Sequence, residues 1–256
     1  MNKDLIKKIV DKKEFSELPI KDVEMALIHF DRPHLTDLEK IKSTRELLHK
    51  VFGAFASRKL LNVKDKNSEW ILKKHLSTRE RFEFYEKIYP RILNGMGKKI
   101  SIIDLGSGVN GFSYGFFDKL GKDVSYVSVE AVGQLSTLMN NFFDKNKIKA
   151  ESHHLSLFDT DKVLKLVQKQ KKPRVIFLFK VIDSLEMLEK DYSKNFISAF
   201  APFSDRFVLS FATESMISRR KFKANRKWII DFVKDNFNVL DDFTLGGERF
   251  FVFEKN

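Results

Sequence analysis

Residues 102–111, with the sequence IIDLGSGVNG, join an apolar run to an acid and two closely spaced glycines. Asp104 ends the apolar run, and Gly106 and Gly108 follow it. Glycine allows a tight turn and lets a ligand approach the backbone, as happens after the first strand of nucleotide-binding α/β domains. Gly111 falls in the wrong register to complete the three-glycine dinucleotide pattern. The segment therefore predicts a site for a nucleotide-like ligand of another type.

A second acid, Glu130, ends the next predicted strand. A carboxylate at this point can accept hydrogen bonds from both hydroxyls of a ribose. The pattern D-x-G-x-G followed by such an acid resembles the cofactor site of S-adenosylmethionine-dependent methyltransferases. Asp159 follows a third predicted strand, where it is placed to meet the amino group of an adenine. For either acid, a solvated strand end is the simpler alternative.

Residues 75–81, HLSTRER, are predicted to start a helix. Ser77 and Glu80 have the spacing of a capping box, in which the serine is the N-cap and the glutamate reaches back to it. An apolar stripe downstream, ending in residues 88–92, supplies the buried face of the capped helix.

A capping box does not explain Arg79 and Arg81, because cations in a first helical turn oppose the helix dipole. We expect an anion to compensate them. The candidates are the carboxylate of a bound cofactor, Asp104 or Glu80 in the same site, and an RNA phosphate, all of which suit the forked guanidinium group. With His75 beside them, these arginines predict one wall of a methyl-donor pocket.

The composition narrows the class of protein. Hydrophobic residues make up 43% of the 256 residues, enough for the core of one α/β domain and a small appendage. The chain has no cysteine, which excludes disulfides, thiolate metal sites and enzymes that add a cysteine thiolate to a pyrimidine. The adjacent His153 and His154 have no third ligand in view, so no metal site is expected.

The net charge of +12 predicts a polyanionic partner, because basic surfaces bind nucleic acids by releasing counterions. A generally lysine-rich composition is the simpler alternative, and charge alone does not separate RNA from DNA or an acidic membrane. No stretch approaches the about 20 apolar residues of a membrane span, and the charged first residues do not resemble a secretory leader. We therefore expect a cytoplasmic protein without a membrane partner.

Hydrophobic periodicity divides the chain into two parts. Residues 1–68 are predicted to form a small all-helical domain, with prolines at the joins and a linker within 62–69. Residues 69–256 alternate strands with helices, which favours a mostly parallel sheet covered on both faces, of the Rossmann-like type. The strands are predicted at residues 100–106, 124–131, 149–159, 174–182, 205–213 and 248–255.

From about residue 70 to its end, the chain resembles the 16S ribosomal RNA methyltransferases that confer aminoglycoside resistance by methylating N7 of a decoding-site guanine. That family carries a His-x-Ser-Thr-Arg-Glu-Arg segment and then an Asp-Leu-Ala-Cys-Gly-Leu-Asn-Pro loop, matched here by residues 75–81 and 104–111. Later stretches agree in order: FLFKVIDSLEMLEK, VLSFATESMISRRKF and LGGERFFVF. Ser107 replaces the family's cysteine, and Gly111 replaces its proline.

The resemblance implies a site for each ligand, with Arg79 on the cofactor carboxylate, Glu130 on the ribose and Asp159 on the adenine. The residues implied to bind S-adenosylmethionine are His75, Arg79, Asp104, Gly106, Gly108, Glu130, Phe158 and Asp159. Those implied to face the RNA are Lys180, Glu186, Arg219, Arg220 and Lys221, with Lys180 and Glu186 positioning the base. The helical residues 1–68 would dock on the RNA of the 30S subunit, so their removal is expected to leave cofactor binding intact. A monomer is expected.

The chemistry follows from the target atom. Guanine N7 carries a lone pair and no proton, so methyl transfer to it needs no general base, only positioning and desolvation. The same reasoning allows adenine N1, and the target base would leave its stack. Two alternatives stay open: a methyltransferase acting on transfer RNA or on a ribose hydroxyl, with Lys180 as base, and a non-enzymatic RNA-binding protein on a methyltransferase fold.

Overall fold

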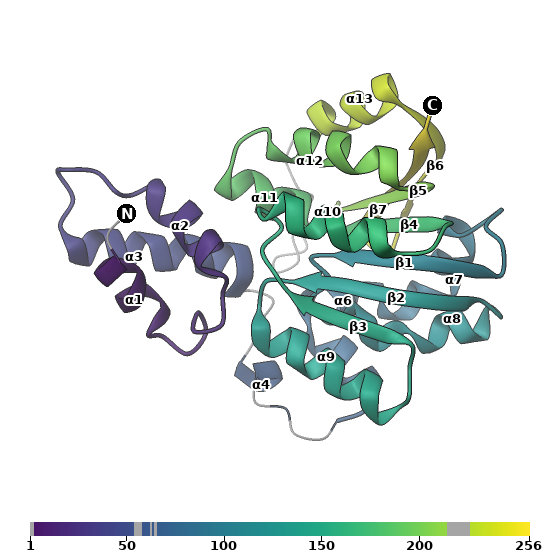
Figure 1. Cartoon of the computed structure of the whole chain (residues 1–256), viewed down its shortest axis with the longest axis horizontal. Helices are drawn as coiled ribbons and strands as arrows, with labels where there is room; N and C mark the ends of the chain where they lie inside the picture. The colour runs from purple at the N-terminus through teal and green to yellow at the C-terminus, as the bar shows by residue number, and fades with distance from the viewer. Residues whose placement is uncertain (1–2, 54–57, 62, 64–65, 214–225) are drawn as a thin grey trace.

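A helical part and a sheet part make up the chain, and helices α1, α2 and α3 stand to one side of the sheet (Figure 1). The computed structural model describes residues 3–53, 58–61, 63, 66–213 and 226–256. Arg219, Arg220 and Lys221, predicted to face RNA, lie outside the described residues. Within the described ranges, the structure contains no helix with the length and apolar character needed to cross a membrane.

The described residues before Ser68 contain helices and connecting turns without a strand. Helix α1 packs against α2, and Leu5, Ile9, Val23 and Leu27 are buried in the same hydrophobic cluster. The helices of this part are α1 (Lys3–Val10), α2 (Ile20–Ile28), α3 (Asp37–Leu48), the π-helical η1 (His49–Gly53) and α4 (Arg58–Leu61).

The remaining residues form one seven-stranded sheet in the order β3-β2-β1-β4-β5-β7-β6. All neighbouring pairs from β3 to β5 are parallel, whereas β7 is antiparallel to β5 and to β6. The strands are β1 (Lys99–Leu105), β2 (Asp123–Glu130), β3 (Ala150–His154), β4 (Arg174–Phe179), β5 (Arg206–Ala212), β6 (Phe237–Leu245) and β7 (Glu248–Lys255). Strand β6 was not predicted, because its residues alternate between half-buried and exposed on the edge of the sheet.

Successive side chains of each central strand enter opposite layers, so both faces of the sheet are buried. Ile102 lies in the layer covered by α7, α8 and α9, and Ile103 lies in the layer covered by α10, α12 and α13. The covering helices are α7 (Tyr85–Ile92), α8 (Gly115–Lys119), α9 (Gly133–Lys145), α10 (Thr160–Lys169), α11 (Ile182–Leu188), α12 (Tyr192–Phe200) and α13 (Lys227–Asn236), with 3-10 turns η3 (Asn110–Ser113) and η4 (Ala201–Phe203). The predicted α/β class is confirmed.

The predicted capping box is wrong. Helix α5 (Ser68–Lys74) is followed by α6 (Leu76–Arg81), the 3-10 turn η2 (Phe82–Phe84) and then α7. His75, not Ser77, stands at the N-cap of α6, and no side chain caps that helix. Ser77 is buried inside α6, and Glu80 forms an ion pair with Lys180 instead of reaching back along its own helix. Glu80 thus pairs with Lys180, a residue distant in the chain, in place of the predicted capping interaction with Ser77.

Candidate functional site

A pocket lies at the carboxyl ends of β1, β2 and β4, with about 780 Å³ of space that includes part of its opening to solvent. This is the point where the strand order reverses, since β1 is followed on one side by β2 and on the other by β4. Open α/β sheets bind ligands at such switch points. Helices α2, η1, α6 and α11 supply the remaining walls, so the helical part of the chain contributes directly to the pocket.

The glycine loop after β1 forms the floor of the pocket. Gly106 and Gly108 have φ angles of +72° and +57°, in the left-handed region that other residues avoid. A β-carbon on Gly108 would lie 2.6 Å from the His75 imidazole, and one on Gly106 would lie 2.6 Å from Val181. Both glycines are therefore required by conformation and by space, as the sequence predicted for a close backbone approach.

Glu130 holds this loop in place while also lining the pocket. Its Oε2 accepts a hydrogen bond of 2.7 Å from the Gly108 backbone N–H, and its Oε1 accepts one of 2.9 Å from Val132. Burial raises the pKa of Glu130, and these two backbone donors oppose that shift. Each carboxylate oxygen keeps a further lone pair that a ribose hydroxyl can use.

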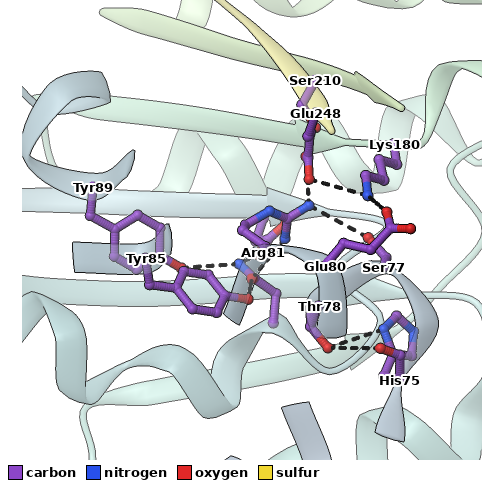
Figure 2. A network of polar contacts seen from close by, with 12 residues as sticks. His75, Ser77, Thr78, Glu80, Arg81, Tyr85, Tyr89, Lys180, Ser210 and Glu248 are labelled. Carbon is purple, nitrogen blue, oxygen red and sulfur yellow. Dashed lines mark hydrogen bonds and ion pairs between the residues drawn. The ribbon is translucent and has the colours of Figure 1, made fainter. Parts of the chain in front are cut away.

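A buried network of charged groups lies behind the loop (Figure 2). Arg81 Nη2 lies 2.8 Å from Glu248 Oε1, and both side chains are 1% exposed. Lys180 Nζ lies 3.2 Å from Glu248 Oε2 and 2.5 Å from Glu80 Oε2, and Ser210 donates to Glu248. Helix α6, the end of β4, strand β5 and strand β7 are thus joined by one network, which sets Arg81 and Lys180 at the pocket wall.

The network fixes the charge of its members. Burial alone would raise the pKa of Glu248, but the charges of Arg81 and Lys180 together lower it, so the carboxylate stays ionised. Burial and these same two cations lower the pKa of His75 to about 3, which keeps its imidazole neutral. Lys180 has a φ of +60°, unusual for a residue other than glycine, at the carboxyl end of β4.

A second set of hydrogen bonds orients Arg81 from the other side. Asn110 Oδ1 accepts from Arg81 Nη1 at 3.1 Å and from the Tyr85 hydroxyl at 2.7 Å. Asp104 Oδ2 in turn accepts from Asn110 Nδ2 at 2.7 Å and from the Tyr126 hydroxyl at 2.6 Å. Asp104 is fully buried and does not line the pocket, so it acts through Asn110. The predicted cofactor contact of Asp104 is therefore not supported by the pocket lining.

The structure gives Arg79 and Arg81 opposite environments. Arg79 is exposed and does not line the pocket, whereas Arg81 is 2% exposed and does. The pocket lining gives no support to the prediction that Arg79 binds the cofactor carboxylate and instead offers Arg81 for that role. The anion that compensates Arg81 is Glu248, which was not among the expected candidates.

Two other predicted residues also lie outside the pocket lining. Asp159 pairs with Lys162 at 3.0 Å at the start of α10, while the adjacent Phe158 does line the pocket. Glu186 accepts hydrogen bonds from the backbone N–H groups of Asp191 and Ser193 at 2.7 and 2.8 Å, and so caps α12. Of the predicted residues, those that line the pocket are His75, Gly106, Gly108, Glu130, Phe158 and Lys180.

Several residues of the site were not predicted. Glu248 was missed because it opens a C-terminal strand far from the glycine loop in sequence. Asp22, Val51 and Phe52 line the pocket from the helical part, which gives no support to the expectation that this part is independent of cofactor binding. An acid within an otherwise amphipathic helix, such as Asp22 in α2, is a weak signal for a buried ligand contact.

The lining suits S-adenosylmethionine. The left-handed glycine loop leaves the backbone open for close approach, and Glu130 beside it offers acceptors to a ribose. Leu135, Leu157 and Phe158 provide apolar walls for a purine ring, and Arg81 and Lys180 provide cations for a carboxylate. Sheet order, pocket position and lining together define the fold of the S-adenosylmethionine-dependent methyltransferases.

Within that class, the chain is similar to methyltransferases of ribosomal RNA. It is 23% identical over 258 residues to the 16S rRNA (guanine(1405)-N(7))-methyltransferase of Proteus mirabilis, covering 87% of this chain and 86% of the relative. The 16S rRNA methylase RmtB matches with a TM-score of 0.77 at 17% identity over 100% and 99% of the two chains. The complex of the 16S rRNA methyltransferase RmtF with S-adenosyl-L-homocysteine matches with a TM-score of 0.78 at 16% identity over 100% of both chains.

No protein-family model matches the chain. At identities of 16% and 17% the structural likenesses show a shared fold. The resemblance to the 16S rRNA methyltransferases that the sequence motifs predicted is confirmed by these matches.

Proposed function

We propose that this chain is an S-adenosylmethionine-dependent methyltransferase that acts on 16S ribosomal RNA, with N7 of a decoding-region guanine as its target. The observation that carries the proposal is the pocket at the switch point, where the glycine loop, Glu130 and the buried cations Arg81 and Lys180 converge. The likeness to 16S rRNA methylases along nearly the whole chain supports the substrate class.

Each part of the pocket has a proposed role in holding the cofactor. Glu130 accepts from the ribose hydroxyls, and Phe158 packs on the adenine. Arg81, held in position by Glu248 and Asn110, binds the methionine carboxylate with a guanidinium that cannot lose its charge. When bound, the cofactor supplies an electrophilic methyl group.

The protein's task at the reacting end is to position the base and exclude water. Guanine N7 presents a lone pair, so no side chain has to remove a proton. Lys180 follows the carboxyl end of β4, and its ammonium group donates a hydrogen bond to Glu80 and forms an ion pair with Glu248. An ammonium group held in this way can orient a base but is not placed to remove a proton from it. The geometry gives no support to a ribose-hydroxyl substrate, which would need Lys180 as a base.

We propose that the helical part docks on the RNA. The net charge of this part does not by itself predict such docking. Residues 1–53 carry eleven Lys and Arg against ten Asp and Glu, so the excess of +12 lies mainly further along the chain. The exposed Lys3, Lys7 and Lys8 of α1 nevertheless form one solvent face opposite its buried leucine and isoleucines. Phosphate contacts from such a face would position the enzyme on 30S RNA.

The test is methylation of purified 30S subunits with labelled cofactor, followed by primer extension and mass mapping of the 16S RNA. Methylation of a single guanine at N7 is expected. Label found only on transfer RNA, only on a ribose or on no RNA would contradict the proposal. If no RNA is labelled although the chain binds the cofactor, a non-enzymatic RNA-binding protein on this fold is favoured.

A further inference from the structure

Asp22 is an acid of the helical part that lies inside the cofactor pocket. It is the third residue of α2, is 2% exposed and lines the pocket together with Val51 and Phe52 of η1. Among the described residues, no hydrogen-bond partner is found for its Oδ2. A buried carboxyl oxygen without a partner is costly, and its position in the pocket points to a bound ligand as that partner.

The position in a first helical turn does not explain this burial. Asp37 occupies the first turn of α3 and gains the same favourable interaction with the helix dipole while fully exposed to solvent. Asp22 gains nothing extra from the dipole by being buried, and it loses hydration. Its place in the pocket therefore requires another reason.

The surroundings of Asp22 belong to the adenosyl side of the pocket. The Ser156 hydroxyl lies beside it, and the charged or titratable groups that face it are Glu130 from β2, Asp159 from the start of α10 and Tyr192 from α12. The cations Arg81 and Lys180 line the same pocket from α6 and the end of β4.

We propose that Asp22 binds the adenosyl half of the cofactor, with its carboxyl group protonated and donating a hydrogen bond from the Oδ2 side. The proposal rests on the function proposed above. Adenine presents ring nitrogens that can only accept, and the ribose ring oxygen also accepts. Glu130 is an acceptor on this side of the pocket, and a protonated Asp22 adds a donor that these acceptor atoms of the ligand can use.

The protonation state agrees with this role. Burial raises the pKa of Asp22 to about 7, the charges of Glu130 and Asp159 add to the rise, and the Ser156 hydroxyl opposes it. A carboxyl group kept neutral near pH 7 can donate a hydrogen bond that a carboxylate cannot. Because Asp22 sits in α2, a bound cofactor also ties the helical part to the sheet.

The experiment is calorimetry on the full chain with two ligands, S-adenosylmethionine and 5′-methylthioadenosine, which keeps the adenosyl half and lacks the amino acid. Asp22→Ala should weaken both ligands by about ten-fold or more, because a buried partner is lost. Asp22→Asn keeps a donor at the same place and should stay within about three-fold of the parent chain. The matched control Asp37→Asn should change neither affinity.

The dependence of ligand affinity on pH distinguishes a binding role of Asp22 from a purely structural one, because a structural role would leave this dependence unchanged. Between pH 6 and 8.5, the affinity of the parent chain for methylthioadenosine should fall by at least about three-fold as Asp22 ionises, while Asp22→Asn stays flat. Hydrogen exchange should show that the ligand protects the amides of α2 in the parent chain and less so in Asp22→Ala.

Three outcomes would overturn the inference: unchanged affinity in Asp22→Ala, a loss confined to S-adenosylmethionine, or identical pH profiles for the parent chain and Asp22→Asn. If Asp22→Ala fails to fold, the pH comparison between the other two chains decides. Failure of the parent chain to bind either ligand would instead reject the proposed function and this inference together. Normal binding without RNA methylation would reject only the substrate.

Discussion

The guanidinium of Arg81 lies 2.8 Å from the carboxylate of Glu248, although 167 residues separate the two in the chain. Both side chains are 1% exposed, so the charge of Arg81 is compensated by Glu248, while Glu248 is compensated by Arg81 together with Lys180. The pair joins helix α6 to strand β7 (Figure 2), and Arg81 also lines the pocket. It fixes the position of the cation that we propose to bind the methionine carboxylate.

Arg81 and Arg79 form a natural comparison, since they stand two residues apart on α6. Arg81→Ala should lower the free energy of unfolding by about 3–5 kcal/mol, because it leaves Glu248 buried without its main partner. Arg81→Lys should fold better but bind S-adenosylmethionine at least about ten-fold more weakly, since a lysine cannot make the forked contact. Chemical denaturation and calorimetry measure both effects.

Arg79→Ala is the control for these variants, and it should change neither stability nor cofactor affinity beyond about 0.5 kcal/mol, as for other exposed sites. A large loss of cofactor affinity in Arg79→Ala, with none in Arg81→Lys, would restore the assignment made from sequence motifs alone.

Alanine substitutions at Gly108 and Gly121 distinguish the cost of a strained backbone from the cost of a steric clash. Both have positive φ angles, +57° and +63°, but a β-carbon meets the His75 ring at 2.6 Å only at Gly108, and it meets nothing within 4 Å at Gly121. Gly121→Ala should therefore cost about 1–2 kcal/mol of stability and leave cofactor binding intact. Gly108→Ala should also displace His75 and abolish measurable cofactor binding.

Calorimetry on the two variants at a temperature where both are folded checks this. Equal cofactor affinity in Gly108→Ala and Gly121→Ala would show that the space over Gly108 has no role in binding.

The raised pKa of Asp22 predicts how the stability of the cofactor-free chain depends on pH. Because its pKa is raised from 3.8 to about 7 on folding, the folded state favours the protonated form. The stability associated with that form is fully present below pH 3.8 and is lost as the pH rises to about 7. Relative to Asp22→Asn, the parent chain should lose up to about 4 kcal/mol across this range.

Denaturant titrations of both chains at pH 5, 6, 7 and 8 measure the difference. A constant difference across these values would mean that Asp22 does not titrate where its burial implies.

Charge reversal at Lys7 and Lys8 tests whether the exposed face of α1 binds RNA. Reversing both to glutamate should weaken binding to 30S subunits and make the slope of log affinity against log salt shallower by about one to two contacts. Cofactor affinity should not change, because these exposed side chains do not line the pocket. The matched control reverses Lys165 and Lys169, which are exposed on α10.

Filter binding at several salt concentrations provides the measurement. If the α10 reversal weakens RNA binding as much as the α1 reversal, the effect is one of total charge and the docking surface lies elsewhere.

Sequence reasoning succeeded where the determinants are local. The glycine loop and Glu130 follow apolar strands directly, so their meeting at the carboxyl ends of β1 and β2 follows from parallel pairing. It failed where partners are distant in the chain. Arg81 gave a local sign that it needed an anion, but nothing near it identified Glu248, and a capping box explained Ser77 and Glu80 equally well until Lys180 was in place.

Asp22 could not be predicted as a pocket residue for a different reason. Its helix belongs to a part of the chain that the hydrophobic pattern separates from the sheet, and only packing of α2 and η1 against α11 carries it into the pocket. Edge strand β6 was missed because it is only half buried, which weakens the apolar signal of a strand.

Mapping the methylated atom tests the central claim most directly. Purified 30S subunits incubated with the protein and S-adenosylmethionine should gain one methyl group, located by primer extension and mass spectrometry at N7 of a guanine in the decoding region of 16S RNA. A methyl group on any other atom, or a chain that binds the cofactor and leaves 30S RNA unmodified, would contradict the account.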